Sequence, residues 1–211
     1  TQFITVTGDA HILDVEIPFI EGQYLGPGAH DAFFVPSISD ESGTLYEHCA
    51  RALDRSLPQG AHGLPLMGTG DWNDGMNRVG IGGVGESVWL GFFLFHVLTH
   101  FSEVARARDD DSLAAWCTAA SQQLRENLAK HAWDGEWYRR AWFDDGTPLG
   151  SKRSDECQID SISQSWAVLS GAADSERAQQ AMQALDRHLV RRDAGLIQLL
   201  TPAFDQTPKD P

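Results

Sequence analysis

Long segments with helical periodicity fill the second half of the sequence, and this pattern limits the fold more than any other feature. Helices are expected at about 87–106, 112–130, 161–171 and 175–190. In the second segment, apolar side chains recur three and four residues apart on one stripe: Leu113, Trp116, Cys117, Ala120, Leu124 and Leu128. Paired helices with inserts between the pairs are typical of an α-hairpin array or an (α/α)6 toroid.

The first forty residues read as strand and loop material instead. Partial alternation over 12–17 predicts a short strand that Pro18 should end, and 32–35 is a second extended run. From Ser42 the pattern turns helical, with Leu45 as the first apolar residue of a stripe, until Pro58 closes it. We therefore expect a lead-in over 1–40 and a mainly helical domain over 41–211.

The length of the chain limits how much of a toroid it can form. A closed ring of twelve helices needs roughly 300 residues or more, given ordinary helix and loop lengths. The chain has 211 residues. The sequence therefore predicts a mainly α fold that forms about half of an (α/α)6 toroid. Short β-hairpins are expected in the inserts, turning at Asp134–Gly135 and at Asp144–Gly146.

A long segment without periodicity separates the first expected helix from the others. Residues 58–85 contain nine glycines. Loops of this length in a compact domain are usually functional or disordered. Leu64, Met67 and Trp72 argue against disorder, because disordered segments are poor in large apolar and aromatic residues. We interpret 58–85 as a functional loop.

The centre of this loop, GDWNDGMN at 70–77, has the side chains that sugar chemistry uses. Cleaving a glycosidic bond needs a carboxylic acid to protonate the leaving oxygen, and Asp71 and Asp74 are two candidates. The ring of Trp72 is suited to stack on a sugar face, and the Asn73 amide to bind hydroxyl groups. The other interpretation is that Asp and Asn are turn formers. Spacing alone leaves both open.

Other polar and aromatic groups have two interpretations each. Glu156 and Asp160 precede Gln164, either as a second cluster facing a cleft or as a solvated helix start. Core packing is the interpretation for the three tryptophans on helical stripes: Trp89, Trp116 and Trp166. Three more lie near the turns, where packing is only slightly favoured over exposure to a cleft: Trp133, Trp137 and Trp142.

Charge and cysteine content exclude several classes of protein. A net charge of −14 disfavours binding to nucleic acid or to anionic membrane surfaces. The three cysteines follow no ligand pattern, so we interpret them as buried hydrophobic residues in a reducing compartment. No metal is expected, because His62, His96 and His100 lack a Glu or Cys partner pattern.

The longest apolar run, 88–98, is too short to span a bilayer, and we interpret it as a core helix. No signal peptide is recognised and residue 1 is not Met, so we expect a piece of a longer protein.

Four stretches together resemble a known family: HGLPLMGTGDWNDGMNRVG (62–80), GESVWLGFF (85–93), SDESGTLYEHCARALDRSL (39–57) and ECQIDSISQSWAVLSGAAD (156–174). They are similar to the family 94 glycoside hydrolases, the inverting sugar phosphorylases. The similarity is greater to the carboxy-terminal phosphorylase-like domain of cyclic β-1,2-glucan synthases and to 1,2-β-oligoglucan phosphorylases. It covers essentially the whole chain.

This resemblance implies an (α/α)6 barrel and assigns roles within it. The general acid of the family falls on Asp74, and the motif tryptophan that lines the sugar subsite falls on Trp72. Asp71 is left with a supporting role or contact with a hydroxyl group. The further residues that we expect to bind sugar are Asn73, Asn77 and Gln164. Inorganic phosphate is the nucleophile and co-substrate, so neither a cofactor nor a second catalytic carboxylate is needed.

The activity implied is inverting phosphorolysis of β-1,2-linked glucooligosaccharides to α-glucose 1-phosphate, linked to cyclic β-1,2-glucan synthesis. The family's upstream Arg/Asp segment and downstream Glu/Asn/Gly/His segment have no counterpart here. We therefore expect the 211 residues to hold the acid, to lack a complete phosphate site and to pack against the rest of a parent chain. The segment is expected to be cytoplasmic, with no membrane insertion of its own, and is compatible with a parent in a bacterial inner membrane.

Two alternatives remain. One is an inverting (α/α)6 hydrolase, with water as nucleophile and a second carboxylate as base. The other is a fragment without catalytic activity that binds glucan or only packs against its parent, because half a toroid exposes apolar faces.

Overall fold

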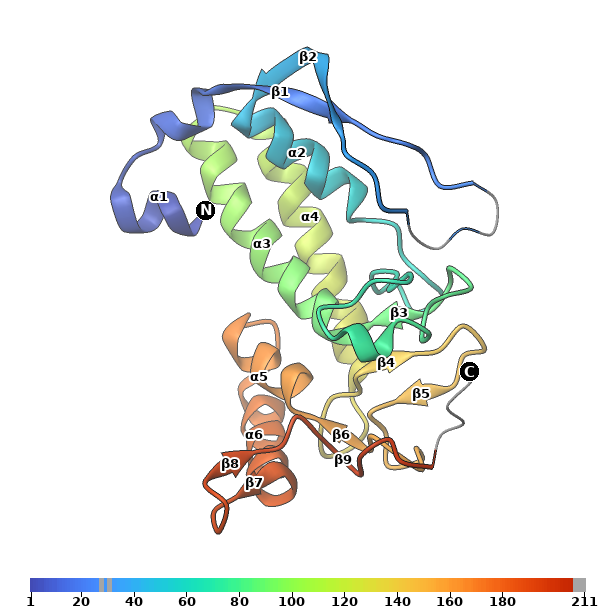
Figure 1. Ribbon diagram of the computed structural model, residues 1–211. Coiled ribbons are helices and arrows are strands. Elements are labelled where there is room, and N and C mark those ends of the chain that lie inside the picture. Colours follow the sequence, from blue (N-terminus) through green and yellow to red (C-terminus); the bar gives the residue numbers. More distant parts are fainter. Residues whose placement is uncertain (27–28, 30–31, 207–211) are drawn as a thin grey trace. The chain divides into compact units, whose positions relative to one another are not determined.

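The computed structural model describes residues 1–26, 29 and 32–206 (Figure 1). The chain forms two compact units, one made of Thr1–Leu57 and one that starts at Pro58.

The first unit contains a two-stranded antiparallel sheet and one long helix. Its elements in order are α1 (Gln2–Thr7), the 3₁₀-helix η1 (His11–Asp14), β1 (Glu16–Glu21), β2 (Ser37–Thr44) and α2 (Leu45–Arg55). The helix expected after Ser42 is confirmed as α2. Thr44 and Glu47 form a capping box at its start, which satisfies two backbone N–H groups that the first turn leaves free.

The strand predictions for the lead-in need correction. Pro18 does not end a strand but lies inside β1, opposite Ser42, next to an irregularity between Pro18 and Ile20. Both strands of a two-stranded sheet are edge strands, and edge strands are where a sheet tolerates proline. The second extended run was expected at 32–35, and β2 begins only at Ser37. Helix α1 was not predicted.

The second unit is mainly helical, as the sequence predicts. Its helices are α3 (Val88–Ala107), α4 (Asp111–Asn127), the π-helix η3 (Leu128–Ala132), α5 (Ser161–Leu169) and α6 (Ser175–Leu189). All four expected helices are confirmed to within a few residues. Each α-helix begins after a residue whose side-chain oxygen accepts a hydrogen bond from the first turn: Ser87, Asp110, Asp160 and Asp174.

The helices of this unit are arranged as two hairpins. Helix α3 packs along α4, α5 packs along α6, and α3 also contacts α5 (Figure 1). Leu64, Phe92 and Leu128 belong to the core beneath them. Two α-hairpins in contact fit part of the predicted (α/α)6 toroid, and the ring itself stays a prediction.

Short strands lie before, between and after the hairpins. They are β3 (Glu86–Ser87), β4 (Ala141–Trp142), β5 (Pro148–Leu149), β6 (Ile159–Asp160), β7 (Val190–Arg191), β8 (Leu196–Ile197) and β9 (Leu200–Thr201). The sheet that bears on the functional loop has the order β3-β4-β5 and is antiparallel. Both predicted turns are confirmed. Asp134 N–H donates to the Trp137 carbonyl around Gly135, and Phe143 N–H donates to the Thr147 carbonyl around Gly146.

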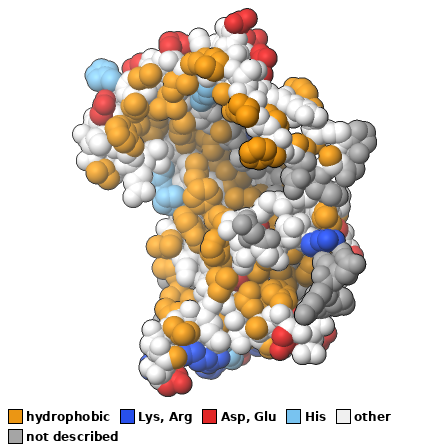
Figure 2. All heavy atoms as spheres, in the orientation of Figure 1, with side chains coloured by type: hydrophobic (Ala, Val, Ile, Leu, Met, Phe, Trp, Pro, Cys, Tyr) orange, Lys and Arg blue, Asp and Glu red, His pale blue; other side chains and the backbone are white. Residues whose placement is uncertain are grey.

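Helix α3 is long and apolar enough to cross a membrane by length and composition alone, with a mean hydropathy of 1.3 over its best window. Half of that window is buried, and core helices of soluble proteins pass the same test, so this is weak evidence for a membrane span. Hydrophobic side chains are also exposed on this unit (Figure 2), among them Phe93 on α3 and Val168 and Leu169 on α5.

Candidate active site

The loop over 58–85 folds into successive turns at GDWNDGMN. Asp71 Oδ1 accepts a hydrogen bond from Asn73 N–H at 3.0 Å, and Asn73 Oδ1 accepts one from Gly75 N–H at 3.1 Å. The 3₁₀-helix η2 (Asp74–Met76) follows directly. Asp71 and Asn73 therefore do act as turn formers. These turns determine the direction of the side chains next to them.

Two side chains of the motif lie at the surface, and a third is partly exposed. Trp72 is 51% exposed, Asn77 is exposed and Asn73 is half-buried. The backbone of Asp74 opens η2, whereas its side chain lies outside the part of the chain that the structure describes. An open aromatic ring next to two accessible amides is compatible with the sugar-binding role predicted for Trp72, Asn73 and Asn77.

Asp71 lies below the surface. Its side chain is 3% exposed, and Oδ1 accepts a hydrogen bond from Arg140 Nη2 at 2.5 Å. Oδ2 accepts another from the indole Nε1 of Trp89 at 3.1 Å. An enclosed carboxylate that is paired with a guanidinium does not fit contact with a sugar hydroxyl. The geometry fits the other predicted role, support of the loop.

Arg140 is fully buried and links three segments. Besides Asp71, its Nη1 donates to Ser87 Oγ at 3.3 Å, and its Nε lies 3.5 Å from Asp160 Oδ2. A buried guanidinium costs much free energy unless carboxylates neutralise it. Asp71 and Asp160 do so here, although Arg140 Nε itself makes no hydrogen bond. Sequence analysis did not single out Arg140. The signal was a charged pair inside an aromatic run, YRRAWF, but nothing in the sequence separates Arg140 from Arg139.

Asp160 is the second carboxylate on Arg140. As the N-cap of α5 it accepts a hydrogen bond from Ile162 N–H at 2.8 Å. Burial raises the pKa of Asp160 to about 6, with the Asp71 carboxylate acting in the same direction, while Arg140 and the Ile162 N–H oppose the shift. Two carboxylates thus share one buried guanidinium.

Glu86 anchors the first part of the loop. It is 1% exposed, and its carboxylate accepts hydrogen bonds from His62 N–H at 3.0 Å and Leu64 N–H at 2.9 Å. The ring of His62 contacts the same carboxylate at 2.5 Å and stacks on Trp142. Gly60 is required beside it, because a Cβ there would lie 2.4 Å from Glu86 Cγ. The sequence showed Glu86 only as the acid before an apolar helix.

Asp144 anchors the end of the loop. Its carboxylate accepts backbone hydrogen bonds from Gly82 at 2.6 Å, Val84 at 3.0 Å and Gly85 at 2.8 Å. Burial by itself would raise the pKa of Asp144, but the three N–H donors outweigh it and leave that pKa lowered. The sequence predicted Asp144 as a turn residue and missed this second function.

Apolar contacts hold the middle of the loop. Met67, Met76 and Val79 are buried and pack against the β4–β5 hairpin in a cluster that also contains Ala141, Leu149 and Cys157. Burial raises the pKa of the Cys157 thiol well above its usual range, with the Asp160 carboxylate adding to the shift. The buried interpretation of the cysteines is confirmed for Cys117 and Cys157, whereas Cys49 is half-buried.

The predicted cluster around Gln164 is divided between core and surface. Gln164 is 0% exposed: Oε1 accepts from Tyr138 N–H, and Nε2 donates to the carbonyls of Tyr138 and Asp160. Its amide is fully used inside the protein, so the structure offers no free group for the predicted sugar contact. Glu156 instead accepts hydrogen bonds from the backbone of Asp205 and Gln206 at the surface.

The tryptophans near the turns favour packing over a cleft. Trp137 is 4% exposed, and its Nε1 donates to the carbonyls of Gly150 and Gln158. Trp133 and Trp142 are half-buried against the main core, as is Trp166. Within the described ranges, no group of three or more His, Cys, Asp or Glu side chains gathers as a metal site.

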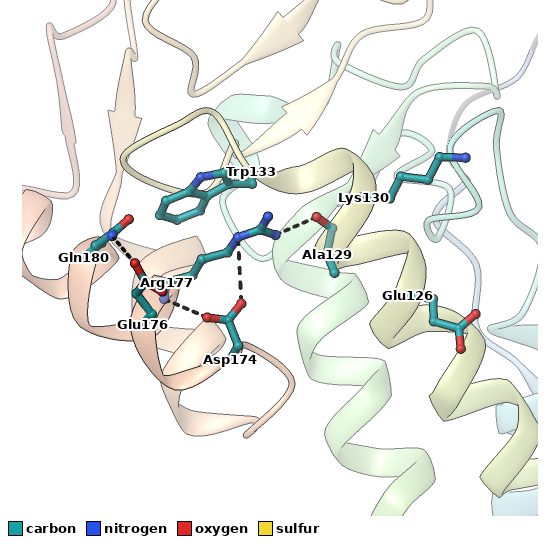
Figure 3. Close-up of a pocket in the computed structure, with 8 residues that line it drawn as sticks. All are labelled: Glu126, Ala129, Lys130, Trp133, Asp174, Glu176, Arg177 and Gln180. Atoms are coloured by element: carbon teal, nitrogen blue, oxygen red, sulfur yellow. Dashed lines mark hydrogen bonds and ion pairs between the residues drawn. The ribbon is translucent and has the colours of Figure 1, made fainter.

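A hollow of about 700 Å³ lies elsewhere in this unit, where α4 and η3 meet the start of α6 (Figure 3). Its polar groups mostly bind one another. Arg177 Nη1 donates to the Ala129 carbonyl at 2.6 Å, Arg177 Nε lies 3.7 Å from Asp174, and Gln180 Nε2 donates to Glu176. The residues predicted from the sequence as catalytic or sugar-binding do not line it.

Comparison with known proteins gives a consistent result. Residues 2–211 match the family model of the glycosyl hydrolase 94 superfamily, catalytic domain. The chain is 49% identical over 211 residues to cyclic beta-(1,2)-glucan synthase NdvB of Rhizobium meliloti (strain 1021), a match that covers 100% of the chain and 8% of that protein.

Two phosphorylases are also similar. Solabiose phosphorylase of Paenibacillus borealis is 41% identical over 157 residues, 74% of the chain and 20% of the relative. N,N'-diacetylchitobiose phosphorylase of Vibrio furnissii is 32% identical over 212 residues, 99% of the chain and 23% of the relative. The chain therefore spans less than a quarter of the length of each of these relatives.

Proposed function

The chain belongs to the glycosyl hydrolase 94 superfamily, and from that premise we propose that it is part of a catalytic unit that phosphorolyses β-1,2-linked glucooligosaccharides. The family resemblance assigns the proton donor to Asp74. One observation supports this assignment: Asp71, the other aspartate of the motif, is enclosed by Arg140 and Trp89. A relative named as a cyclic beta-(1,2)-glucan synthase and several named as phosphorylases support the substrate and the reaction.

In the proposed reaction the Asp74 carboxyl gives its proton to the glycosidic oxygen as the bond from that oxygen to the anomeric carbon breaks. An oxygen of inorganic phosphate attacks the same carbon from the opposite face, which forms α-glucose 1-phosphate and releases the shortened glucan. Phosphate replaces the water and the second carboxylate of an inverting hydrolase. Trp72 stacks on the sugar at the cleavage point, and Asn73 and Asn77 bind hydroxyl groups.

The nucleophile is the test of this reaction. The protein that carries this chain should release α-glucose 1-phosphate from β-1,2-glucooligosaccharides at a rate that depends on phosphate concentration. Anomer-resolved NMR of the products would show it. Cleavage that proceeds equally without phosphate and yields glucose would replace the phosphorylase by the inverting hydrolase.

We also propose that the groups that bind phosphate come from outside these 211 residues. Arg140, the buried guanidinium beneath the loop, is paired with Asp71 and Asp160, so it is not offered to an anion. A second function for the 211 residues alone is therefore glucan binding without turnover, which the exposed ring of Trp72 favours. Calorimetric titration should detect β-1,2-glucan and not phosphate. Tight phosphate binding by the isolated chain would contradict this proposal.

Two further expectations rest on the same family assignment. We propose that the α3/α4 and α5/α6 hairpins form part of an (α/α)6 toroid completed by the rest of the protein. We also propose that this catalytic unit faces the cytoplasm, including in a parent that is anchored in a membrane.

A further inference from the structure

Arg140 lies where two helix starts meet the loop. Ser87 is the N-cap of α3, and its Oγ accepts hydrogen bonds both from Leu90 N–H at 3.4 Å and from Arg140 Nη1 at 3.3 Å. Asp160 is the N-cap of α5 and lies 3.5 Å from Arg140 Nε. The guanidinium thus joins the N-terminal ends of both helices to the loop through Asp71.

The backbone of Arg140 is held as firmly as its side chain. Its N–H donates to the Leu149 carbonyl at 2.8 Å, and its carbonyl accepts from Val88 N–H at 3.1 Å. Gly150 packs directly against it, because a Cβ at Gly150 would lie 2.4 Å from Arg140 N. The base of the side chain therefore has no room to shift, and the planar guanidinium offers its donors in a fixed fork.

The contacts continue from Arg140 to the start of η2. Arg140 fixes Asp71 Oδ1, and this same oxygen accepts the hydrogen bond from Asn73 N–H. Trp89 Nε1 on α3 holds the other carboxylate oxygen. Asn73 in turn is the N-cap of the 3₁₀-helix whose first residue is Asp74. Three consecutive contacts therefore set the backbone direction at Asp74.

We propose that Arg140 is a positioning residue for general-acid catalysis, acting through Asp71 on the backbone that carries Asp74. It does not touch the sugar. The proposal rests on the proposed function of Asp74. It assigns to Arg140 the alignment of the acid with the leaving oxygen, where an error of about 1 Å lowers the rate by about 10²-fold.

The test compares two substrates in the protein that carries this chain. A β-1,2-glucooligosaccharide needs a proton on its leaving oxygen, whereas β-glucosyl fluoride releases fluoride without one. Arg140→Lys should lower phosphorolysis of the oligosaccharide by about 10²-fold, because lysine keeps the charge and loses the fork. Turnover of the fluoride should fall by less than about 5-fold, since that reaction does not need the acid.

Two variants serve as references. Asp74→Asn should show the same selectivity between substrates, with a larger loss on the oligosaccharide. Arg139→Lys is the matched control, because Arg139 is the adjacent arginine and binds the carbonyls of His131 and Trp133 and the carboxylate of Asp134 instead of the loop. It should leave turnover of both substrates unchanged.

Asp71→Asn covers the case in which Arg140→Lys does not fold, and it should give the same substrate-selective loss. Equal losses on both substrates in folded Arg140→Lys, or in Asp71→Asn when Arg140→Lys does not fold, would reduce Arg140 to a structural role. Full activity of the tested variant on the oligosaccharide would also show that Arg140 does not position the acid. If Asp74→Asn keeps its activity on the oligosaccharide, the proposed function of Asp74 fails instead, so the two failures are distinguishable.

Discussion

The loop over 58–85 and the lead-in, whose second strand β2 extends it from the predicted 1–40 to residue 44, are both long segments outside the main helices. Only the loop has a buried interior. In the described part of the lead-in, the buried residues are Leu13 and Gly43, and large side chains such as Ile20 and Ile38 are more than 70% exposed. The loop buries Leu64, Pro65, Met67, Met76, Val79, Gly80 and Gly85.

The charged groups that hold the loop are mostly buried, whereas those that hold the lead-in lie at the surface. The loop is tied down by buried groups, namely Glu86 and the Asp71–Arg140 pair, and by Asp144. In the lead-in, the corresponding contacts, Ser39 to Glu21 and Ser42 to Glu16, lie at the surface. Exposed pairs contribute little, whereas breaking a buried pair is strongly destabilising. A loop that must present an acid in one position requires the second kind of contact.

The largest stability effect should come from Arg140→Met. It leaves Asp71 and Asp160 buried without their cation and should lower the free energy of unfolding of the second unit by about 3–5 kcal/mol. All seven tryptophans lie in this unit, so urea unfolding followed by tryptophan fluorescence reports on it alone.

The matched change in the first unit is Arg51→Met. Arg51 is exposed and lies over the Phe19 ring at 4.1 Å. Its loss should cost at most about 1 kcal/mol, measured by circular dichroism. A similar loss of stability in Arg140→Met and Arg51→Met would contradict the difference between buried and exposed charged groups.

Asp160→Asn should change how stability depends on pH. Burial raises the pKa of Asp160 from 3.8 to about 6, so the folded state holds this proton more tightly than the unfolded chain. The resulting stabilisation is complete below about pH 3.8 and is lost as pH rises through about 6. Asn keeps the N-cap acceptor and does not titrate. Between pH 4 and 7 the free energy of unfolding of the variant should therefore rise by about 2 kcal/mol relative to that of the wild type. Equal pH dependence of the free energy of unfolding in the variant and the wild type would contradict this prediction.

Met76→Ala tests the apolar anchor of the loop. Met76 is 3% exposed and packs against the β4–β5 hairpin, so the truncation should cost about 2–4 kcal/mol. In the lead-in, Ile38→Ala removes a side chain that is 76% exposed and should change stability by less than about 0.5 kcal/mol. Chemical denaturation of both variants measures these changes in the free energy of unfolding. An equal loss of stability in the two variants would show that Ile38 is covered in solution.

Trp72→Ala should lower the free energy of unfolding by only about 1 kcal/mol, because half of the side chain is exposed. Its affinity for β-1,2-glucan should nevertheless fall by about 10-fold, as when an aromatic anchor is removed from a binding surface. Chemical denaturation measures the change in stability, and titration with β-1,2-glucan measures the change in affinity. Unchanged glucan affinity would remove Trp72 from the sugar site.

Sequence patterns predicted the helices well and the supports of the loop poorly, for a physical reason. A helix such as α4 can be predicted from local sequence, because it has an apolar stripe and a capping residue, Asp110. The contacts of Arg140 with Asp71 join residues 69 positions apart, and no local pattern encodes them. Gln164 shows the opposite error: a polar residue expected at a sugar is buried because Tyr138 offers it backbone partners. The motif predicted loop residues to face a sugar but not the buried contacts that support the loop.

The division of roles between the two aspartates of GDWNDGMN is the central claim, and the rate of glucose 1-phosphate release by Asp74→Asn tests it most directly. The variant of the protein that carries this chain should lose about 10²–10⁴-fold in phosphorolysis of β-1,2-glucooligosaccharides while it still binds them. A variant that turns over at the wild-type rate would show that Asp74 is not the acid, and the account of the site would be wrong.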